Sequence, residues 1–306
     1  MIQVVYNGQD ITDNVSINRC WHDMYAQGSA DTLTLIVGDA GSLWDSWGPA
    51  VGDTVQITYG SITTGKMHVN GVSPINGLFT ITARSAPASC YDAQYKAWSK
   101  IRLLQIGQEI ADRHGLTFKS YGVTDHLYNY ILQNGQNDLS FLARRAKLES
   151  CSFLIYDGAL ILYDEKYMES QTASETITIG QDGEYRFYDD RAKLYGSCKL
   201  EVGGFSGEYT AGNGSNRILT APDDIYVGSN EEAARFAQGL LRAANNGCCN
   251  GWVKGRILPG YAAASMASLE CSRAPSWNGP VFLYHIRNDY AAGETKLFFR
   301  RPLEGY

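Results

Sequence analysis

The feature that most constrains the fold is a repeated alternation of apolar and polar residues in the first 95 positions. Three segments alternate strictly with a period of two, at residues 31–37, 53–59 and 78–82, and threonine fills most of the polar positions. Side chains of a β-strand point to opposite faces in turn, so this pattern predicts half-buried strands. Gly, Asn and Asp clusters separate the segments at spacings typical of antiparallel barrels or sandwiches.

The pattern changes after Trp98. Residues 99–114 place Leu103, Ile106 and Ile110 at helical spacing, and Gly115 follows where a helix commonly ends. A second helix is expected from Asp138, which we place as its cap. Two apolar runs then flank Asp157-Gly158, which is a strong hairpin signal. The segment 96–170 is therefore predicted to be a small α/β insert.

The remainder is again mostly β. Strands are expected at 176–179, 198–202, 281–286 and 296–300, and residues 203–216 are predicted to form a polar, glycine-rich, mobile loop. Ser229 can cap a helix over about 230–243. The predicted fold class is mainly β with an α/β insert (α+β). Two antiparallel β-barrel modules, 1–95 and 171–306, would flank the insert 96–170, and the helix would belong to the second module.

Composition excludes several classes of protein. Charged residues make up 19% of the chain and the net charge is −6, which argues against a dedicated nucleic-acid binder. No apolar run is long enough to span a membrane, and the first residues, 1–5, lack the basic region and the long apolar region of a secretory signal. The seven cysteines are scattered, apart from the adjacent Cys248-Cys249, which is unlike a disulfide framework or a zinc site. We expect free thiols in a protein folded in the cytosol.

A search for catalytic patterns assigns no catalytic, cofactor-binding or metal-binding residue. The histidines have no metal-binding spacing, and no nucleophile elbow is present, since Ser206 lies in a glycine-rich loop without that spacing. The adjacent carboxylates Asp189-Asp190 and Asp223-Asp224 are interpreted as turn or cap residues, and His285 as a core or interface residue. The chain is therefore expected not to be an enzyme and to need no cofactor.

The run from Tyr130 to Ala146 contains Gln133, Asp138 and the residues Leu139 to Ala146 in the order Q-x-x-x-x-D-L-x-F-L-x-R-x-A. This resembles a signature of the contractile-tail baseplate hub family, which includes phage late-control D proteins and the N-terminal regions of VgrG proteins. Three other parts of the chain resemble segments of the same family in the same order: 49–69, 103–116, and 279–300.

This resemblance implies a structural subunit that forms a homotrimer. Each chain would contribute two tube-like barrels to a pseudo-hexameric ring that adapts the sixfold tail tube to the threefold central spike. The implied partners are further copies of the chain, the tail tube protein and a spike, with tape measure and baseplate wedge proteins as additional candidates. Because few residues follow Phe299, the spike is expected to be a separate protein. The subunit would be made in the bacterial host cytoplasm and assembled into a virion tail or an injection-machine baseplate.

Two other classes of function stay open. One is a tail-associated hydrolase of cell wall or polysaccharide, which would need an acid/base pair or a nucleophile. The other is a carbohydrate-binding β protein that uses some of the 20 tyrosines. Phage tail, tailocin and type VI-like machines are not distinguished by the sequence.

Overall fold

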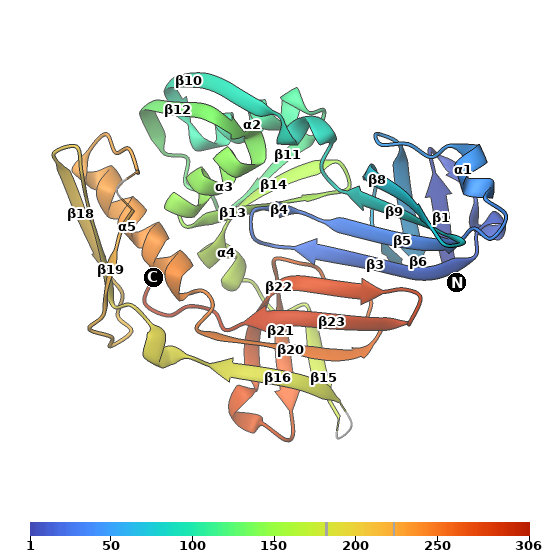
Figure 1. Ribbon diagram of the computed structural model, residues 1–306. Coiled ribbons are helices and arrows are strands. Elements are labelled where there is room, and N and C mark those ends of the chain that lie inside the picture. Colours follow the sequence, from blue (N-terminus) through green and yellow to red (C-terminus); the bar gives the residue numbers. More distant parts are fainter. Residues whose placement is uncertain (181–182, 223) are drawn as a thin grey trace.

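The computed structural model describes residues 1–180, 183–222 and 224–306, and it is mainly β. Figure 1 shows three bodies: a first β module at the right, a second β module at the bottom, and an α/β body above and to the left. The predicted fold class, a mainly β chain with an α/β insert, is therefore confirmed.

The first β module contains the strands expected from the three alternating segments, with boundaries that differ from the expected ones by one or two residues. Its strands surround a core that includes Leu33, Leu35, Ile57 and Ile81. The helix α1 lies at the outer end of this module. Its elements are β1 Ile2–Tyr6, β2 Gln9–Asp10, β3 Ile17–Tyr25, β5 Thr32–Gly38, α1 Leu43–Trp47, β6 Thr54–Tyr59, β7 Ile62–Thr63, β8 Met67–Ile75 and β9 Leu78–Arg84.

The second β module surrounds a separate core, which includes Val253, Leu269, Leu283 and Phe299. The closing strands predicted at 281–286 and 296–300 are longer in the structure. Its strands are β15 Glu175–Ile179, β16 Glu184–Asp189, β20 Cys249–Arg256, β21 Ser265–Cys271, β22 Gly279–Asp289 and β23 Glu294–Arg300.

The α/β body has its own core, in which Trp98, Leu142, Phe153 and Phe236 take part. The pair β4–β13 joins this body to the first module. Its elements, with β4 included, are β4 Ser29–Ala30, β10 Ala93–Arg102, α2 Leu103–Arg113, β11 Thr117–Tyr121, β12 Leu127–Asn137, α3 Asp138–Leu148, β13 Cys151–Tyr156, β14 Ala159–Asp164, α4 Glu165–Glu169, β17 Ser197–Val202, β18 Phe205–Thr210, β19 Ile218–Thr220 and α5 Asn230–Asn245.

The structure corrects the expected position of the second-module helix. The helix, α5, is present and Ser229 caps it by accepting a hydrogen bond from the Glu232 N–H. However, Phe236 of α5 packs into the core of the α/β body. The two helices α3 and α5 approach closely at Gly239, where a Cβ would lie 2.3 Å from the Leu148 carbonyl oxygen. Close backbone packing, which the amphipathic pattern does not specify, decides this placement.

The loop predicted over 203–216 is also corrected. Residues Phe205–Thr210 form β18, which pairs with β17 through a two-residue turn. Gly203 and Gly204 both have positive φ, as such a turn requires. At Gly207 a Cβ would lie 2.1 Å from the Ala234 nitrogen, so this glycine permits close contact with α5. The glycines at 203, 204 and 207 therefore allow a tight turn and a close backbone contact.

Two helix starts differ from the expectation. Residues 93–102 pair with β12 as a strand, so the helix expected from residue 99 begins at Leu103. The cap of α3 is Asn137, whose side chain accepts a hydrogen bond from the Ser140 N–H at 2.8 Å. Asp138 is instead the first helical residue and is completely buried.

The two β modules repeat one arrangement of five antiparallel strands. The first has the order β3-β5-β9-β8-β6 and the second has the order β16-β20-β23-β22-β21, with the same succession along the chain. Each also has a bulge at the same place, after Val69 in β8 and after Leu283 in β22. The repeat ends at the preceding strand, because β1 pairs antiparallel with β6 whereas β15 pairs parallel with β21.

Candidate assembly surfaces

A seam of paired strands joins the two β modules into one continuous sheet. Within it, β22 runs antiparallel to β3, from His285 opposite Tyr25 to Asp289 opposite Trp21. In Figure 1 these strands lie side by side at the centre of the molecule. The chain therefore already contains one junction between two modules of the same topology.

A carboxylate holds this seam together. Asp23 on β3 accepts hydrogen bonds from His285 Nε2 at 2.7 Å and from Arg287 Nε at 2.8 Å, both on β22. Burial by itself would raise the pKa of Asp23, but these donors outweigh it and hold the pKa below its ordinary value. The imidazole of His285 also stacks between Tyr25 and Phe298, with ring centroids 4.7 and 4.4 Å away. His285 thus has a structural position, at an interface within the chain.

A second polar group lies deeper at the same seam. The fully buried His22 places Nδ1 3.1 Å from the Tyr290 hydroxyl, while its Nε2 lies 3.8 Å from Asp31. Trp21 donates from Nε1 to Asp289 at 2.9 Å. These contacts connect β3 with the β22–β23 turn and fix how the two modules meet.

Among the strand edges of the modules that have no partner in the described chain, two correspond to the strands of this seam. One is the outer edge of β16, which pairs only with β20. The other is the part of β8 after the bulge, since β8 pairs with β6 only at Met67 and His68. Unpaired edges of this kind present free N–H and C=O groups to another chain. They are the strands that correspond to β3 and β22 in the repeat.

A buried ionic network connects the second module to the α/β body. Arg300 of β23 and Arg242 of α5 are both about 1% exposed and face Glu165 and Glu169 of α4. The Arg242 Nε lies 3.0 Å from Glu165, and its Nη2 lies 2.6 Å from Glu169. The two positive and two negative charges balance, as buried ions require. The network therefore ties three elements from different regions of the chain.

The hub-like signature also has a structural explanation. Asp138 at the start of α3 accepts hydrogen bonds from Gln133 at 2.8 Å, from His114 at 2.8 Å, and from Arg113 at 2.8 and 2.9 Å. These donors come from β12 and from the end of α2. The five-residue spacing from Gln133 to Asp138 thus joins a strand to a helix through a buried carboxylate.

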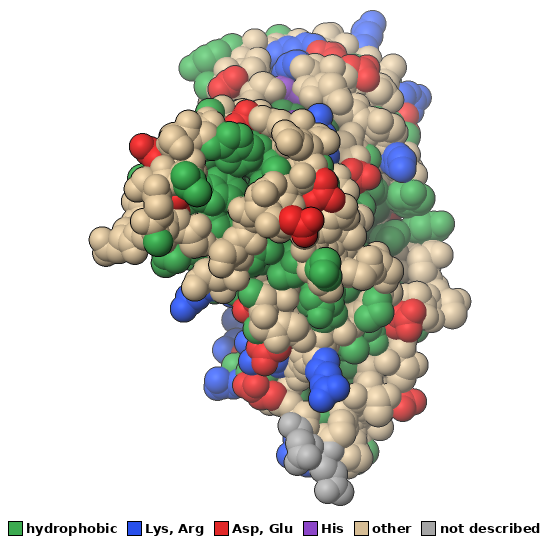
Figure 2. Space-filling model, turned by 90° about the vertical axis from the view of Figure 1, so that its right-hand side faces the viewer, with side chains coloured by type: hydrophobic (Ala, Val, Ile, Leu, Met, Phe, Trp, Pro, Cys, Tyr) green, Lys and Arg blue, Asp and Glu red, His purple; other side chains and the backbone are tan. Residues whose placement is uncertain are grey.

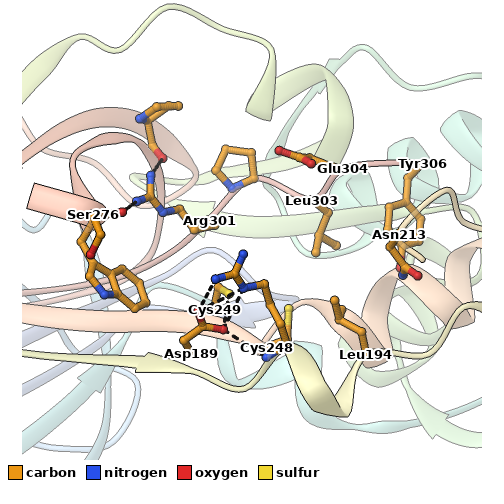
Figure 3. Close-up of a pocket in the computed structure, with 14 residues that line it drawn as sticks. Asp189, Leu194, Asn213, Cys248, Cys249, Ser276, Arg301, Leu303, Glu304 and Tyr306 are labelled. Carbon is orange, nitrogen blue, oxygen red and sulfur yellow. Dashed lines mark hydrogen bonds and ion pairs between the residues drawn. The ribbon is translucent and has the colours of Figure 1, made fainter. Parts of the chain in front are cut away.

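A cavity of about 600 Å³ lies in the second module between the end of β16 and the chain terminus. Figure 3 shows Arg301, Cys248 and Cys249 around it. Arg301 donates to the carbonyl oxygens of Ser276 and Asn278 at 3.2 and 3.3 Å. The backbone carbonyl oxygens on this wall of the cavity therefore already accept hydrogen bonds from Arg301.

The carboxylates and thiols at this cavity are not poised for acid–base or nucleophilic chemistry. Asp189 forms a double hydrogen bond with Arg191, which lowers the pKa of Asp189 to about 2. Asp190 lies 3.0 Å from Lys193. Burial, together with nearby negative charge, raises the pKa of Cys249 to about 12. Within the described residues the seven cysteines are free, and no group of metal-ligating side chains is found.

The other carboxylate pair is only partly described. Asp223 lies outside the described residues, whereas Asp224 forms an ion pair with Arg144 at 2.7 Å. None of the described helices is both long and apolar enough to span a membrane.

An apolar surface covers the outer end of the first module, around α1. Leu43, Trp47, Val51 and Ile75 are 48–72% exposed there. Figure 2 looks at this end of the molecule and shows hydrophobic side chains among mostly polar ones. Exposed apolar groups gathered in one region are typical of an interaction surface.

Of the comparisons with known proteins, the one with solved structures finds similar folds. Neither a scan of protein-family models nor a search of curated proteins gives a match. Among solved structures, the 43 kDa tail protein of prophage MuSo2 from Shewanella oneidensis is similar, with a TM-score of 0.75, 15% identity and 98% of each chain covered. A tail protein from Neisseria meningitidis MC58 has a TM-score of 0.75 and 10% identity, with 98% of this chain and 96% of that chain covered.

A third similar structure comes from a secretion system. It is an E. coli component of the type VI secretion system, described as structurally similar to the bacteriophage T4 tail proteins gp27 and gp5. The TM-score is 0.61 at 11% identity, with 95% of this chain and 76% of that chain covered. The protein therefore has the fold of these phage tail and type VI secretion proteins.

Proposed function

We propose that this protein is a structural subunit of a phage tail or related injection machine, and specifically the baseplate hub. Three copies would form a ring in which first and second modules alternate. Six modules of one topology would then match a sixfold tail tube on one side, while the true threefold symmetry would match a central spike on the other.

The repeated five-stranded arrangement is the observation that carries this proposal. A ring of alternating modules needs the same junction within and between chains, and the chain already contains one such junction at β3–β22. The strands that would repeat it, β8 and β16, both have unpaired edges among the described residues. The full-length likeness to two tail proteins supports the same interpretation.

The proposed domain division follows the ranges 1–95, 96–170 and 171–306, with residues 197–245 of the last range packed onto the insert. The insert, enlarged by β17–β19 and α5, would project from the ring and offer surface to baseplate wedge proteins. Tail tube, spike and tape measure proteins would bind at the two ring faces or in its lumen. Synthesis in the bacterial cytoplasm and assembly in the tail belong to the same proposal.

A hydrolase is the alternative that one specific observation favours. The exposed Ser89 places Oγ 2.8 Å from His114 Nδ1, and His114 Nε2 lies 2.8 Å from Asp138. The succession serine, histidine, aspartate is that of a serine hydrolase triad, although the two ring nitrogens exchange their usual partners. However, Asp138 also accepts from Arg113 and Gln133, which a purely structural role explains. A fluorophosphonate probe should leave Ser89 unlabelled, and labelling that Ser89→Ala abolishes would favour the hydrolase.

The proposed ring is tested by measuring mass and symmetry in solution. Light scattering of the protein, alone and co-expressed with neighbouring tail proteins, should give three times the 33.7 kDa chain mass. Micrographs should show rings with six lobes. A monomer under both conditions, with no ring in micrographs, would contradict the proposed function.

A further inference from the structure

The internal seam specifies how a second copy of this chain would pair with the first. This inference rests on the proposed ring and adds the strands, their direction and their register. The partner is a second copy because β8 and β16, which have unpaired edges among the described residues, are the repeats of the two seam strands. A junction between copies would therefore continue an interface that the chain already contains.

The equivalence of the strands is read from their pairing partners. In the first module Asp23 lies opposite Thr32, and Thr32 lies opposite Arg84. In the second module Tyr188 lies opposite Asn250, and Asn250 lies opposite Arg300. Arg84 and Arg300 occupy the same position relative to the bulges of β8 and β22. Asp23 and Tyr188 are therefore equivalent.

The equivalence of β8 and β22 follows from the position of their bulges. His68 lies opposite Arg84, and Phe282 lies opposite Arg300, so that these two residues are equivalent. Counting along each strand past the bulge makes Ser73 equivalent to Arg287. Because Arg287 lies opposite Asp23 at the internal seam, the repeat places Ser73 opposite Tyr188.

We propose that β8 of one copy pairs antiparallel with β16 of the next, with Ser73 opposite Tyr188. The register continues with Val72 opposite Asp189 and with Ile75 opposite Arg186. The seam strands Trp21–Tyr25 and His285–Asp289 supply the template for direction and register.

The exposure of these residues agrees with a surface that is covered on assembly. Ser73 is exposed on β8, Tyr188 is 37% exposed on β16, and Ile75 is 55% exposed at the end of β8. The β16 strand alternates, with Tyr185 and Phe187 packed on the second core. One face of β16 is therefore anchored on the second core, while its outer edge has no partner among the described residues.

The junction between copies would be weaker than the internal seam. Ser73 and Tyr188 supply no counterpart to the ion pair of Arg287 with Asp23. Pro74 has no N–H, so the ladder lacks one donor that Asn288 supplies at the equivalent place. A ring of this kind separates into folded single chains before its modules separate.

Cysteine cross-linking tests the register directly. Directly opposed residues of antiparallel strands have Cα atoms about 4.5–5.5 Å apart, which suits a disulfide. The background variant carries Cys248→Ser and Cys249→Ser, which removes the two half-exposed thiols. On this background, Ser73→Cys with Tyr188→Cys should oxidise to disulfide-linked trimers on a non-reducing gel. The control pair, Ser73→Cys with Arg186→Cys, is two residues out of register and should cross-link at least tenfold more slowly.

A charge test checks the same contact without oxidation. Ser73→Lys with Tyr188→Lys places like charges in opposition and should convert the ring to monomers in light scattering. Ser73→Lys with Tyr188→Glu should keep the ring. Both residues are exposed in the single chain, so circular dichroism should be unchanged.

The outcomes separate this inference from the proposed function. A trimer that cross-links no faster through the matched pair than through the control pair overturns the register and leaves the ring standing. A trimer that survives two opposed lysines overturns the contact in the same way. A protein that is monomeric without any substitution overturns both.

Discussion

The two β modules share five strands and a bulge, yet equivalent positions have different environments. Gly65 in the first module faces the insert, because a Cβ there would lie 2.7 Å from the Asp157 Cβ in the β13–β14 turn. The equivalent Gly279 faces only the Arg301 side chain, beside the open cavity of Figure 3. The insert thus covers one module and leaves the same corner of the other open.

The arginines at the end of β9 and β23 differ in the same way. Arg84 is partly exposed and lies over the Tyr91 ring, whereas the equivalent Arg300 is almost fully buried among glutamates. Topology therefore repeats in the two modules, but burial does not. Of two equivalent residues in the repeat, the one covered by neighbouring elements is buried in the chain, and the other stays partly exposed.

The largest expected effect is a difference in stability between alanine substitutions at these two arginines. Arg300→Ala leaves Glu165 and Glu169 with one cation fewer in a buried site and should reduce the free energy of unfolding by about 3–5 kcal/mol. Arg84→Ala loses a partly exposed cation–π contact and should cost about 0.5–1 kcal/mol. Urea denaturation followed by tryptophan fluorescence measures both. Equal losses would contradict the different burial of the two positions.

Alanine substitutions at the equivalent glycines 65 and 279 should differ less in their effect on the free energy of unfolding. Gly65 and Gly279 both have positive φ, so alanine costs about 1–2 kcal/mol of backbone strain at either position. At Gly65 the added methyl group also meets the Asp157 backbone, which adds about 1–3 kcal/mol of overpacking. Urea denaturation of Gly65→Ala and Gly279→Ala compares them. A greater loss for Gly279→Ala would mean that the open corner is the better packed one.

The seam carboxylate should show a pH-dependent effect. Asp23→Asn weakens charged hydrogen bonds to His285 and Arg287 and should cost about 1–2 kcal/mol at pH 7. Because the pKa of Asp23 is lowered in the folded protein, its contribution is present above the ordinary aspartate pKa and is lost as pH falls through the lower folded value. Unfolding of the variant and the original protein should therefore converge in acid. The matched Tyr188→Asn should change the single chain by less than about 0.5 kcal/mol.

The smallest effect concerns the thiols. Cys248 and Cys249 at the open corner are partly exposed, whereas Cys20 of the first module is buried. Iodoacetamide should label the adjacent pair first, slowly at pH 7 and faster at pH 9, because burial raises the pKa of both thiols. Mass spectrometry of peptides locates the label. Preferential labelling of Cys20 would show that the first module opens more easily than the second.

Much of the local structure was predictable because it depends on neighbours in the chain. The alternation at 31–37, 53–59 and 78–82, the turn at Asp157-Gly158 and the cap at Ser229 each specify an element through backbone geometry. The start of α2 was not predictable in the same way, because pairing with β12 extends a strand into a segment that has helical spacing.

The candidate assembly surfaces were not predictable, since they depend on contacts between distant segments. Asp23 and His285 lie 262 positions apart and meet only because β22 pairs with β3. The repeat of the two modules is visible in strand order and bulge position, which depend on strand pairing. The one sequence signal for the buried cluster around Asp138 was the Gln133–Asp138 spacing. This spacing identified the motif but did not show that His114 and Arg113 also donate hydrogen bonds to Asp138.

The sequence by itself determined the fold class, the helix capped by Ser229 and the hairpin at Asp157-Gly158, because periodicity and turn chemistry act over a few residues. Only the tertiary structure decided that α5 belongs with the insert, that two modules repeat one topology, and that β8 and β16 have edges without a partner among the described residues. The physical reason is that strand pairing and burial join residues far apart in the chain, and a single sequence carries no local pattern for them.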